Sequence, residues 1–147
     1  MADILRSLPK PVAVADYVYD SEILQADLQE LVEEDLLIVV TTESAEEMNT
    51  FVNLAVHLDD GEAITGAIAI HRNWAIATDD RKALALFARV TPQLEVISTL
   101  GMMKHWANAT HASYEEVQTA LQNMRVGAPY EPKPSHPLYQ WWRIYIG

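Results

Sequence analysis

The sequence predicts a mixed α/β fold in which helices cover both faces of a mostly parallel central sheet, a three-layer α/β/α sandwich. Short apolar runs alternate with longer stretches of helical periodicity, which is the pattern of parallel strands joined by helical crossovers. The chain has 147 residues, 50% of them hydrophobic, which is enough for one buried core. Because it has no cysteine, neither disulfides nor cysteine-bound zinc contributes to that core.

Four apolar runs are the predicted strands. The first two consist almost wholly of aliphatic residues, which is typical of strands buried on both faces of a sheet. Two aspartates follow the third run, and Pro92 and Gly101 bound the fourth. In chain order the runs are Pro11–Ala15, Leu36–Val40, Trp74–Thr78 and Leu94–Ser98.

Helices are predicted between and after these runs. Ser44 and Glu47 form a capping box that opens one helix, and Ser113 and Glu116 open another that Gly127 ends. Periodicity predicts that the first of these helices buries Met48, Phe51, Val52, Ala55 and Leu58. The other predicted helices are Ala2–Leu8, Tyr17–Leu36, Glu62–Arg72, Arg81–Arg89 and one that Thr99 caps.

The chain divides into an α/β domain over residues 1–126 and a C-terminal segment over 127–147. This segment begins with a proline-rich connector and ends in an apolar stretch that contains Trp141 and Trp142. So apolar an end is rarely left in solvent. We expect it to pack on the domain or on a partner.

The charge balance narrows the function. A net charge of −11 argues against non-specific nucleic-acid binding, which depends on lysine and arginine. It is compatible with a metal-dependent nuclease, whose clustered carboxylates lower the net charge. No run approaches the roughly 18 apolar residues of a membrane span, so we expect a cytoplasmic protein. The five histidines show no zinc-hydrolase spacing, and no nucleotide-binding glycine loop is present.

Several acidic residues follow predicted strands. Asp16, Asp20 and Glu22 follow the first, Asp79 and Asp80 follow the third, and Glu62 opens a crossover helix. In parallel sheets the carboxyl ends of the strands share one edge, where ligands bind. Carboxylates gathered there repel one another and favour Mg²⁺ or Mn²⁺. The other interpretation is that the aspartate pairs, at 59–60 and 79–80, cap helices or lie in their first turns.

Three phrases in order resemble the PIN-domain family of metal-dependent nucleases. They are Gly61-Glu62-Ala63 at a helix start, Thr78-Asp79-Asp80 after a strand, and Thr99-Leu100-Gly101 before a helix. The resemblance spans residues 2 to about 125. It implies an endoribonuclease, in many members the toxin of a toxin–antitoxin pair, that holds Mg²⁺ or Mn²⁺ with acidic residues. Water bound to the metal attacks the phosphodiester of single-stranded RNA.

Carried over by position, the resemblance assigns Glu22, Glu62 and Asp80 as catalytic metal ligands, with Asp79 as a further ligand. The family's first strand and its aspartate have no counterpart here, so we expect an N-terminally truncated or degenerate domain with two exposed strand edges. Asp16 is the reserve candidate for the first acid. Arg81 and Lys82 are candidates for a nucleic-acid-binding rim.

Two functions therefore remain open. The first is a divalent-metal-dependent ribonuclease, with a possible antitoxin partner and a homodimeric state. The second is a non-catalytic PIN-like module in which the apolar C-terminal segment contacts a partner.

Overall fold

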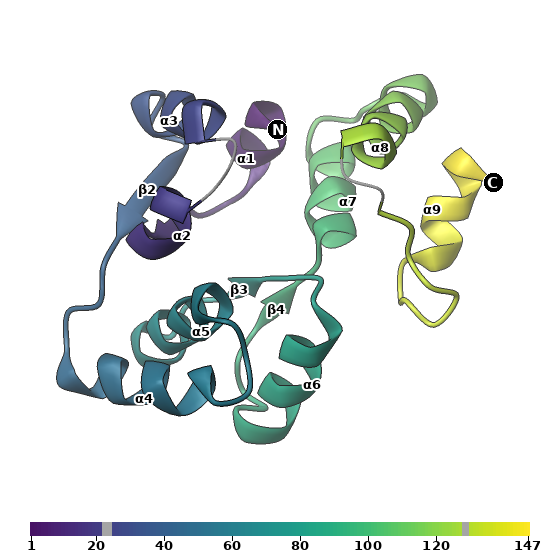
Figure 1. Cartoon of the computed structure of the whole chain (residues 1–147). Helices are drawn as coiled ribbons and strands as arrows, with labels where there is room; N and C mark the ends of the chain where they lie inside the picture. The colour runs from purple at the N-terminus through teal and green to yellow at the C-terminus, as the bar shows by residue number, and fades with distance from the viewer. Residues whose placement is uncertain (22–24, 128–129) are drawn as a thin grey trace. The chain divides into compact units, whose positions relative to one another are not determined.

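The computed structural model describes residues 1–21, 25–127 and 130–147 (Figure 1). These residues form a mixed α/β structure with nine helices and four short strands. They make two compact units, Met1–Thr99 and Leu100–Gly147. Within the described ranges, no helix is long and apolar enough to cross a membrane.

The elements of the first unit alternate much as predicted. They are α1 (Ala2–Ser7), β1 (Val12–Ala15), α2 (Asp16–Ser21), α3 (Gln25–Glu33), β2 (Leu37–Val40), α4 (Ala45–Ala55), α5 (Asp60–Arg72), β3 (Ile76–Ala77), α6 (Arg81–Val90) and β4 (Val96–Ile97). Then α7 (Thr99–Ala109) begins at the last residue of this unit. The second unit adds α8 (Tyr114–Gly127) and α9 (Tyr139–Ile146).

The strands pair in two parallel half-sheets. In the β1–β2 half-sheet, Val12 lies opposite Leu37 and Ala15 opposite Val40. In the β3–β4 half-sheet, Ile76 lies opposite Val96. Among the described residues each half-sheet contains two strands, so β1 and β3 each have an edge without a strand partner. Helix α5 packs against both β1 and β3.

The larger core of the first unit lies where α4, α5 and α6 enclose β3 (Figure 1). Phe87 of α6 is 1% exposed, and its ring fills the space beside Gly66 of α5. A Cβ atom at position 66 would lie 2.7 Å from Phe87 Cζ, so only glycine permits this packing. Buried members of this core are Leu54, Leu58, Ala63, Ala67, Ala69, Ile76, Ala83, Leu86 and Phe87.

The β1–β2 half-sheet has a thinner cover than its aliphatic sequence predicts. Leu37 is buried, but Ile38 is 47% and Val39 37% exposed. Since neighbouring residues of a strand point to opposite faces, neither face of β2 is fully covered. The prediction that this strand is buried on both faces is therefore wrong. In β1 only Ala15 is buried, and it joins Ile64 and Ile68 of α5 in a small second core.

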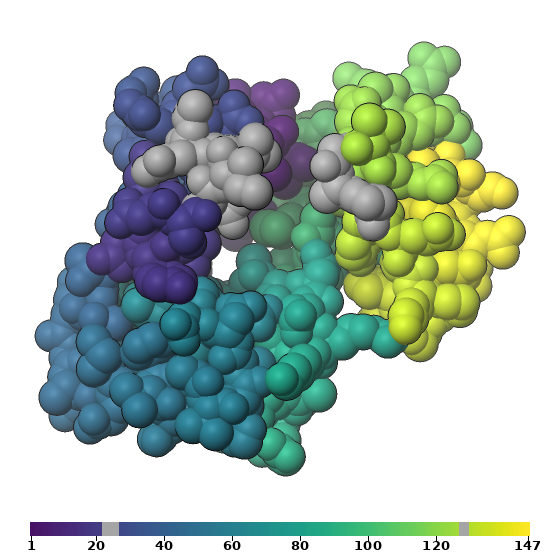
Figure 2. All heavy atoms as spheres, viewed as in Figure 1, coloured from purple at the N-terminus to yellow at the C-terminus, as the bar shows by residue number. Residues whose placement is uncertain are grey.

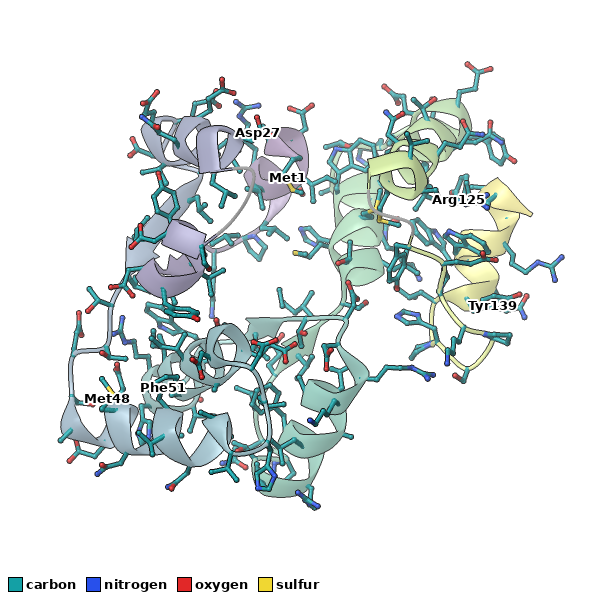
Figure 3. The ribbon with its side chains drawn as sticks, viewed as in Figure 1. Met1, Asp27, Met48, Phe51, Arg125 and Tyr139 are labelled. Carbon is teal, nitrogen blue, oxygen red and sulfur yellow. The ribbon has the colours of Figure 1, made fainter. Side chains whose placement is uncertain are left out.

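Helix α4 buries a narrower face than periodicity predicts. Its Leu54 is buried and Phe51 packs against the core, whereas Met48 and Val52 are 44% and 57% exposed (Figure 3). The predicted burial of Met48 and Val52 is wrong because α4 contacts α5 along one stripe, and the adjacent stripe faces solvent.

Capping residues start several helices where the sequence predicts. Ser44 Oγ accepts the Glu47 amide of α4, and Ser113 and Glu116 form both hydrogen bonds of the capping box of α8. Of the helix predicted over residues 17–36, the structure describes α2 and α3. Its end comes earlier than predicted because Asp35 adopts a left-handed conformation with φ of 58°.

In the second unit, α8 holds α9. The hydroxyl of Tyr114 donates to the Ile144 carbonyl at 3.0 Å, and the Gln118 side-chain amide donates to the Tyr145 carbonyl at 2.9 Å. Trp142 is 4% exposed; its ring stacks with that of Tyr139, and the Arg125 guanidinium lies over the Trp142 ring at 6.0 Å from its centroid. Trp142 is therefore part of the buried core of the second unit.

Candidate functional site

A cleft of about 400 Å³ opens in the first unit beside the carboxyl end of β3. One wall is α2, which rests on α5 (Figure 2). Another wall is the first turn of α5, and β3 and α6 form the floor. The cleft lies at the edge where a parallel sheet presents its ligand-binding loops. Its lining residues are Tyr17, Val18, Ser21, Asp59, Asp60, Gly61, Glu62, Thr65, Ile76, Ala77, Thr78, Ala83 and Phe87.

The first turn of α5 brings three carboxylates to this cleft. Asp59 is the N-cap, and its Oδ1 accepts the Glu62 amide at 2.9 Å. Asp60 and Glu62 follow in the first turn, where the helix dipole favours negative charge. Gly61 makes room for α2, since a Cβ atom there would lie 3.3 Å from Val18 Cγ2. Capping thus accounts for Asp59 and leaves Glu62 facing the cleft.

Among the carboxyl groups that line the cleft, Glu62 has a pKa raised by its surroundings. Burial raises its pKa above the ordinary 4.5, and the negative charges of Asp80 and Asp59 raise it further. Lys82 lowers it, by a smaller effect. Glu62 stands in the first turn of α5 and Asp80 is the N-cap of α6, and of these two acids Glu62 lines the cleft.

The two aspartates after β3 have different local roles. Asp80 caps α6, where its Oδ1 accepts the Ala83 amide at 2.8 Å. Asp79 reaches across to α7, accepting the Thr99 amide at 3.0 Å through Oδ1 and the Thr99 hydroxyl through Oδ2. Both oxygens of Asp79 therefore hold the start of α7, which follows β4. These bonds fit the interpretation of these aspartates as helix-start residues, and they leave Asp80 the freer carboxylate.

The remaining predicted site residues lie in different places. Glu22 lies outside the described residues. Asp16 begins α2 and accepts the Tyr17 amide at 2.8 Å, so its carboxylate stays with its own backbone. Arg81 and Lys82 are exposed in the first turn of α6, next to the Asp80 cap. Of these two, Lys82 is close enough for its charge to act on Glu62.

Across residues 1–21, 25–127 and 130–147, no three His, Asp or Glu side chains are grouped closely enough to hold a metal ion. Carboxylate oxygens are the ligand type that Mg²⁺ and Mn²⁺ prefer, but no three of the described carboxylates are close enough together to bind one ion.

Sequence reasoning missed the hydroxyl-bearing and aromatic side chains of the cleft. Tyr17 and Ser21 of α2, Thr65 of α5 and Thr78 after β3 line it beside the acids. Two of them carried a usable signal, because Tyr17 follows Asp16 after the first predicted strand and Thr78 belongs to the phrase Thr78-Asp79-Asp80. The others could not be found, because their approach depends on how α2 packs on α5.

Comparisons with protein-family models, with curated proteins and with solved structures find no match to this chain.

Proposed function

We propose that the chain is a PIN-like domain of the metal-dependent nuclease type and that the cleft beside Glu62 is its phosphodiester site. The observation that carries the proposal is the cleft at the carboxyl end of a parallel strand, lined by the three carboxylates at the start of α5. The three phrases of the resemblance also lie at the starts of α5, α6 and α7. Two of them are joined by the Asp79–Thr99 hydrogen bonds.

The proposal extends to the fold. Both half-sheets are parallel, and α5 packs against β1 and β3 together. One strand between β1 and β3 would satisfy both open edges and join the half-sheets into the central sheet of a three-layer sandwich. The resemblance places an apolar strand ending in aspartate at that position. An apolar strand ending in aspartate, joined ahead of Met1 by a flexible linker, should therefore raise the melting temperature. The same extension with a central proline should not.

Glu62 and Asp80 are the described residues that would hold the metal ion, with Glu22 as the third ligand outside the described residues. The chemistry supplied by a bound Mg²⁺ or Mn²⁺ would be activation of a water molecule near neutral pH. This chain's own part would be to present Glu62 at the start of α5 and Asp80 at the start of α6, and to hold the start of α7 through Asp79. Lys82, and Arg81 beside it, would meet the phosphates of single-stranded RNA.

A thermal melt with and without millimolar Mn²⁺ at fixed ionic strength tests the metal site. A ligand that binds only the folded state stabilises it by RT ln(1 + [L]/Kd), about 2.7 kcal/mol at a hundredfold excess over Kd. Glu62→Gln should abolish the response to Mn²⁺ and raise the melting temperature without metal, because it removes the repulsion from Asp80 and Asp59. Glu46→Gln, at an exposed first-turn position of α4, is the matched control and should keep the response.

Incubation of single-stranded RNA with the chain and Mn²⁺ tests the activity itself. Cleavage that Glu62→Gln abolishes would support the nuclease. If RNA stays intact with both the chain and its strand-extended form, the catalytic proposal fails.

The second candidate function is a non-catalytic binding module of the same fold. It is favoured by the finding that no three His, Asp or Glu side chains of the described residues are grouped closely enough to hold a metal ion. Its contact surface would be the stripe formed by Met48 and Val52 of α4 and by its C-cap Val56, which are 44%, 57% and 75% exposed. An antitoxin-like protein or a second copy of the chain would cover this stripe. Under this function Mn²⁺ leaves the melting temperature unchanged, and Val52→Asp abolishes the association.

A further inference from the structure

Tyr17 is the aromatic side chain of the cleft that the mechanism above leaves without a role. It stands in the first turn of α2, as the second residue after β1, and is 48% exposed. Asp16 accepts its backbone amide at 2.8 Å, which fixes the turn that presents the ring. The ring contacts seen among the described residues all involve aromatic side chains of the second unit, so the Tyr17 face is not stacked on another ring.

The cleft has two chemically different sides. The start of α5 contributes Asp59, Asp60 and Glu62, whose carboxylates accept hydrogen bonds, and α2 contributes Tyr17 and Val18. A ligand that fits both sides has a flat apolar face and N–H donors on its edge. A nucleobase with an exocyclic amine has this combination, since its face stacks on aromatic rings and its amine donates to carboxylates.

The size of the cleft restricts the state of that nucleobase. A volume of about 400 Å³ is at the small end of ligand sites and suits one nucleotide. A base within a duplex has its faces stacked on its neighbours and its edge paired, so it presents neither surface to the cleft. An unpaired base can be splayed out and stacked on a protein ring.

We propose that the cleft takes one unpaired, amine-bearing nucleobase of single-stranded RNA, stacked on Tyr17, so that Tyr17 sets a preference for unpaired positions. This inference rests on the proposed nuclease function and adds to it the residue that selects the substrate. The phosphodiester next to that base is then brought to Glu62.

The test uses the full chain with Mn²⁺ and one labelled oligoribonucleotide, offered single-stranded and annealed to its complement. Binding is measured by fluorescence anisotropy and cleavage by product formation. Alanine substitution of a stacking ring weakens single-strand binding about five- to 150-fold. Tyr17→Ala should therefore raise Kd and KM for the single strand by a factor in that range with little change in kcat. Tyr17→Phe, which keeps the ring, should restore both.

Trp74→Ala is the matched control, because Trp74 is 43% exposed and does not line the cleft. It should leave Kd unchanged. Melting curves verify that each variant is folded. If Tyr17→Ala is unfolded at the assay temperature, Tyr17→Leu, which keeps apolar bulk without a ring, replaces it in the comparison with the wild type.

The two proposals fail in different ways. If the wild-type chain binds and cuts the single strand and Tyr17→Ala or Tyr17→Leu does so equally well, the stacking inference is wrong and the nuclease stands. Equal use of duplex and single strand would overturn it too. If the wild-type chain neither binds nor cuts RNA, both proposals are wrong.

Discussion

The two half-sheets of the first unit differ in the length of their strands and in the burial of their side chains. The half-sheet with the longer strands is the less buried one. The β1–β2 half-sheet pairs four residues per strand, and the β3–β4 half-sheet pairs two. Yet Ile76 of the shorter β3 belongs to the larger core, enclosed by α4, α5 and α6, whereas both faces of β2 are partly exposed. Burial of apolar area contributes more to stability than a few extra ladder hydrogen bonds, whose net worth is small.

The half-sheets also differ at their carboxyl ends. Asp79 after β3 binds Thr99 after β4, so a side chain closes that end of the half-sheet. Asp16 after β1 binds only the next residue. The end of β2 is held instead from α5, where Arg72 donates to the Thr41 carbonyl at 2.6 Å and to Glu47. We therefore expect the β3–β4 region to be the stable part of the unit.

Removing the ring at the centre of the larger core should have the largest effect. Phe87→Ala leaves a cavity beside Gly66, and such truncations cost about 3–5 kcal/mol. Val90→Ala, at an exposed position of the same helix, should cost no more than about 0.5 kcal/mol. Urea denaturation of both variants measures the difference. Equal costs would show that the β3–β4 region is not the stable part.

Breaking the Arg72–Glu47 pair should have an intermediate effect. The Glu47 carboxylate is 3% exposed and accepts from Arg72 Nε at 2.9 Å. Hydrogen bonds to charged groups contribute about 1.5–3 kcal/mol, and we expect Glu47→Gln to lose a comparable amount. Glu46→Gln, next in the chain and exposed, is the control.

The same pair predicts a pH dependence of known sign. The hydrogen bond from Arg72 holds the pKa of Glu47 below its ordinary 4.5, against the opposing effect of burial. A lowered native pKa gives stability that is present above the unfolded pKa and is lost as pH falls through the native pKa. Melting temperatures measured downward from pH 6 should therefore fall less steeply in Glu47→Gln than in the wild type. Parallel curves would contradict this assignment.

Removing the hydrogen bond from the Thr99 hydroxyl to Asp79 should cost less stability than breaking the Arg72–Glu47 pair. Thr99→Val keeps the shape of the side chain and the backbone bond to Asp79 but removes the hydroxyl donor, which should cost about 1–2 kcal/mol. Thr110→Val removes a hydroxyl that binds only its own helix, at the Trp106 carbonyl, and serves as the control. The two variants should separate in a thermal melt, and coincident melts would mean that this hydrogen bond does not stabilise the unit.

The smallest effect is expected on the open side of β2. Ile38→Thr keeps β-branching at a side chain that is 47% exposed, so its cost should stay within about 0.5 kcal/mol. Leu37→Ala, one residue away and buried, should cost about 2–5 kcal/mol. If Ile38→Thr costs as much as Leu37→Ala, a partner covers this face in solution.

Local signals predicted the elements well because they act over a few residues. The N-cap at Ser44 and the capping box at Ser113 depend on adjacent backbone groups, and the structure confirms both. At Ser44 the reciprocal bond of a capping box is replaced, since the Glu47 carboxylate accepts the Glu43 amide. Burial was harder to predict. Met48 and Ile38 carry the right side chains for a core, but their exposure depends on what packs against α4 and β2. The strands at residues 76–77 and 96–97 are also shorter than their apolar runs, because the length of a strand depends on how far its partner strand runs beside it.

For the candidate site, the sequence predicted which acids follow which strands. It could not predict that both Asp79 oxygens would be taken by Thr99, since that bond joins residues 20 positions apart. Nor could it predict that Tyr17 and Glu62 line the same cleft, because this depends on the approach of α2 to α5.

The open edges of β1 and β3 also bear on how the protein behaves at high concentration. An unpaired strand edge is a template on which another chain can add, the usual first step of edge-to-edge aggregation. A net charge of −11 keeps copies apart at low ionic strength. Salt shortens the range of that repulsion, from about 10 Å at 0.1 M to about 3 Å at 1 M. Colloidal stability of this chain should therefore be greatest in dilute buffer and decline as salt is added.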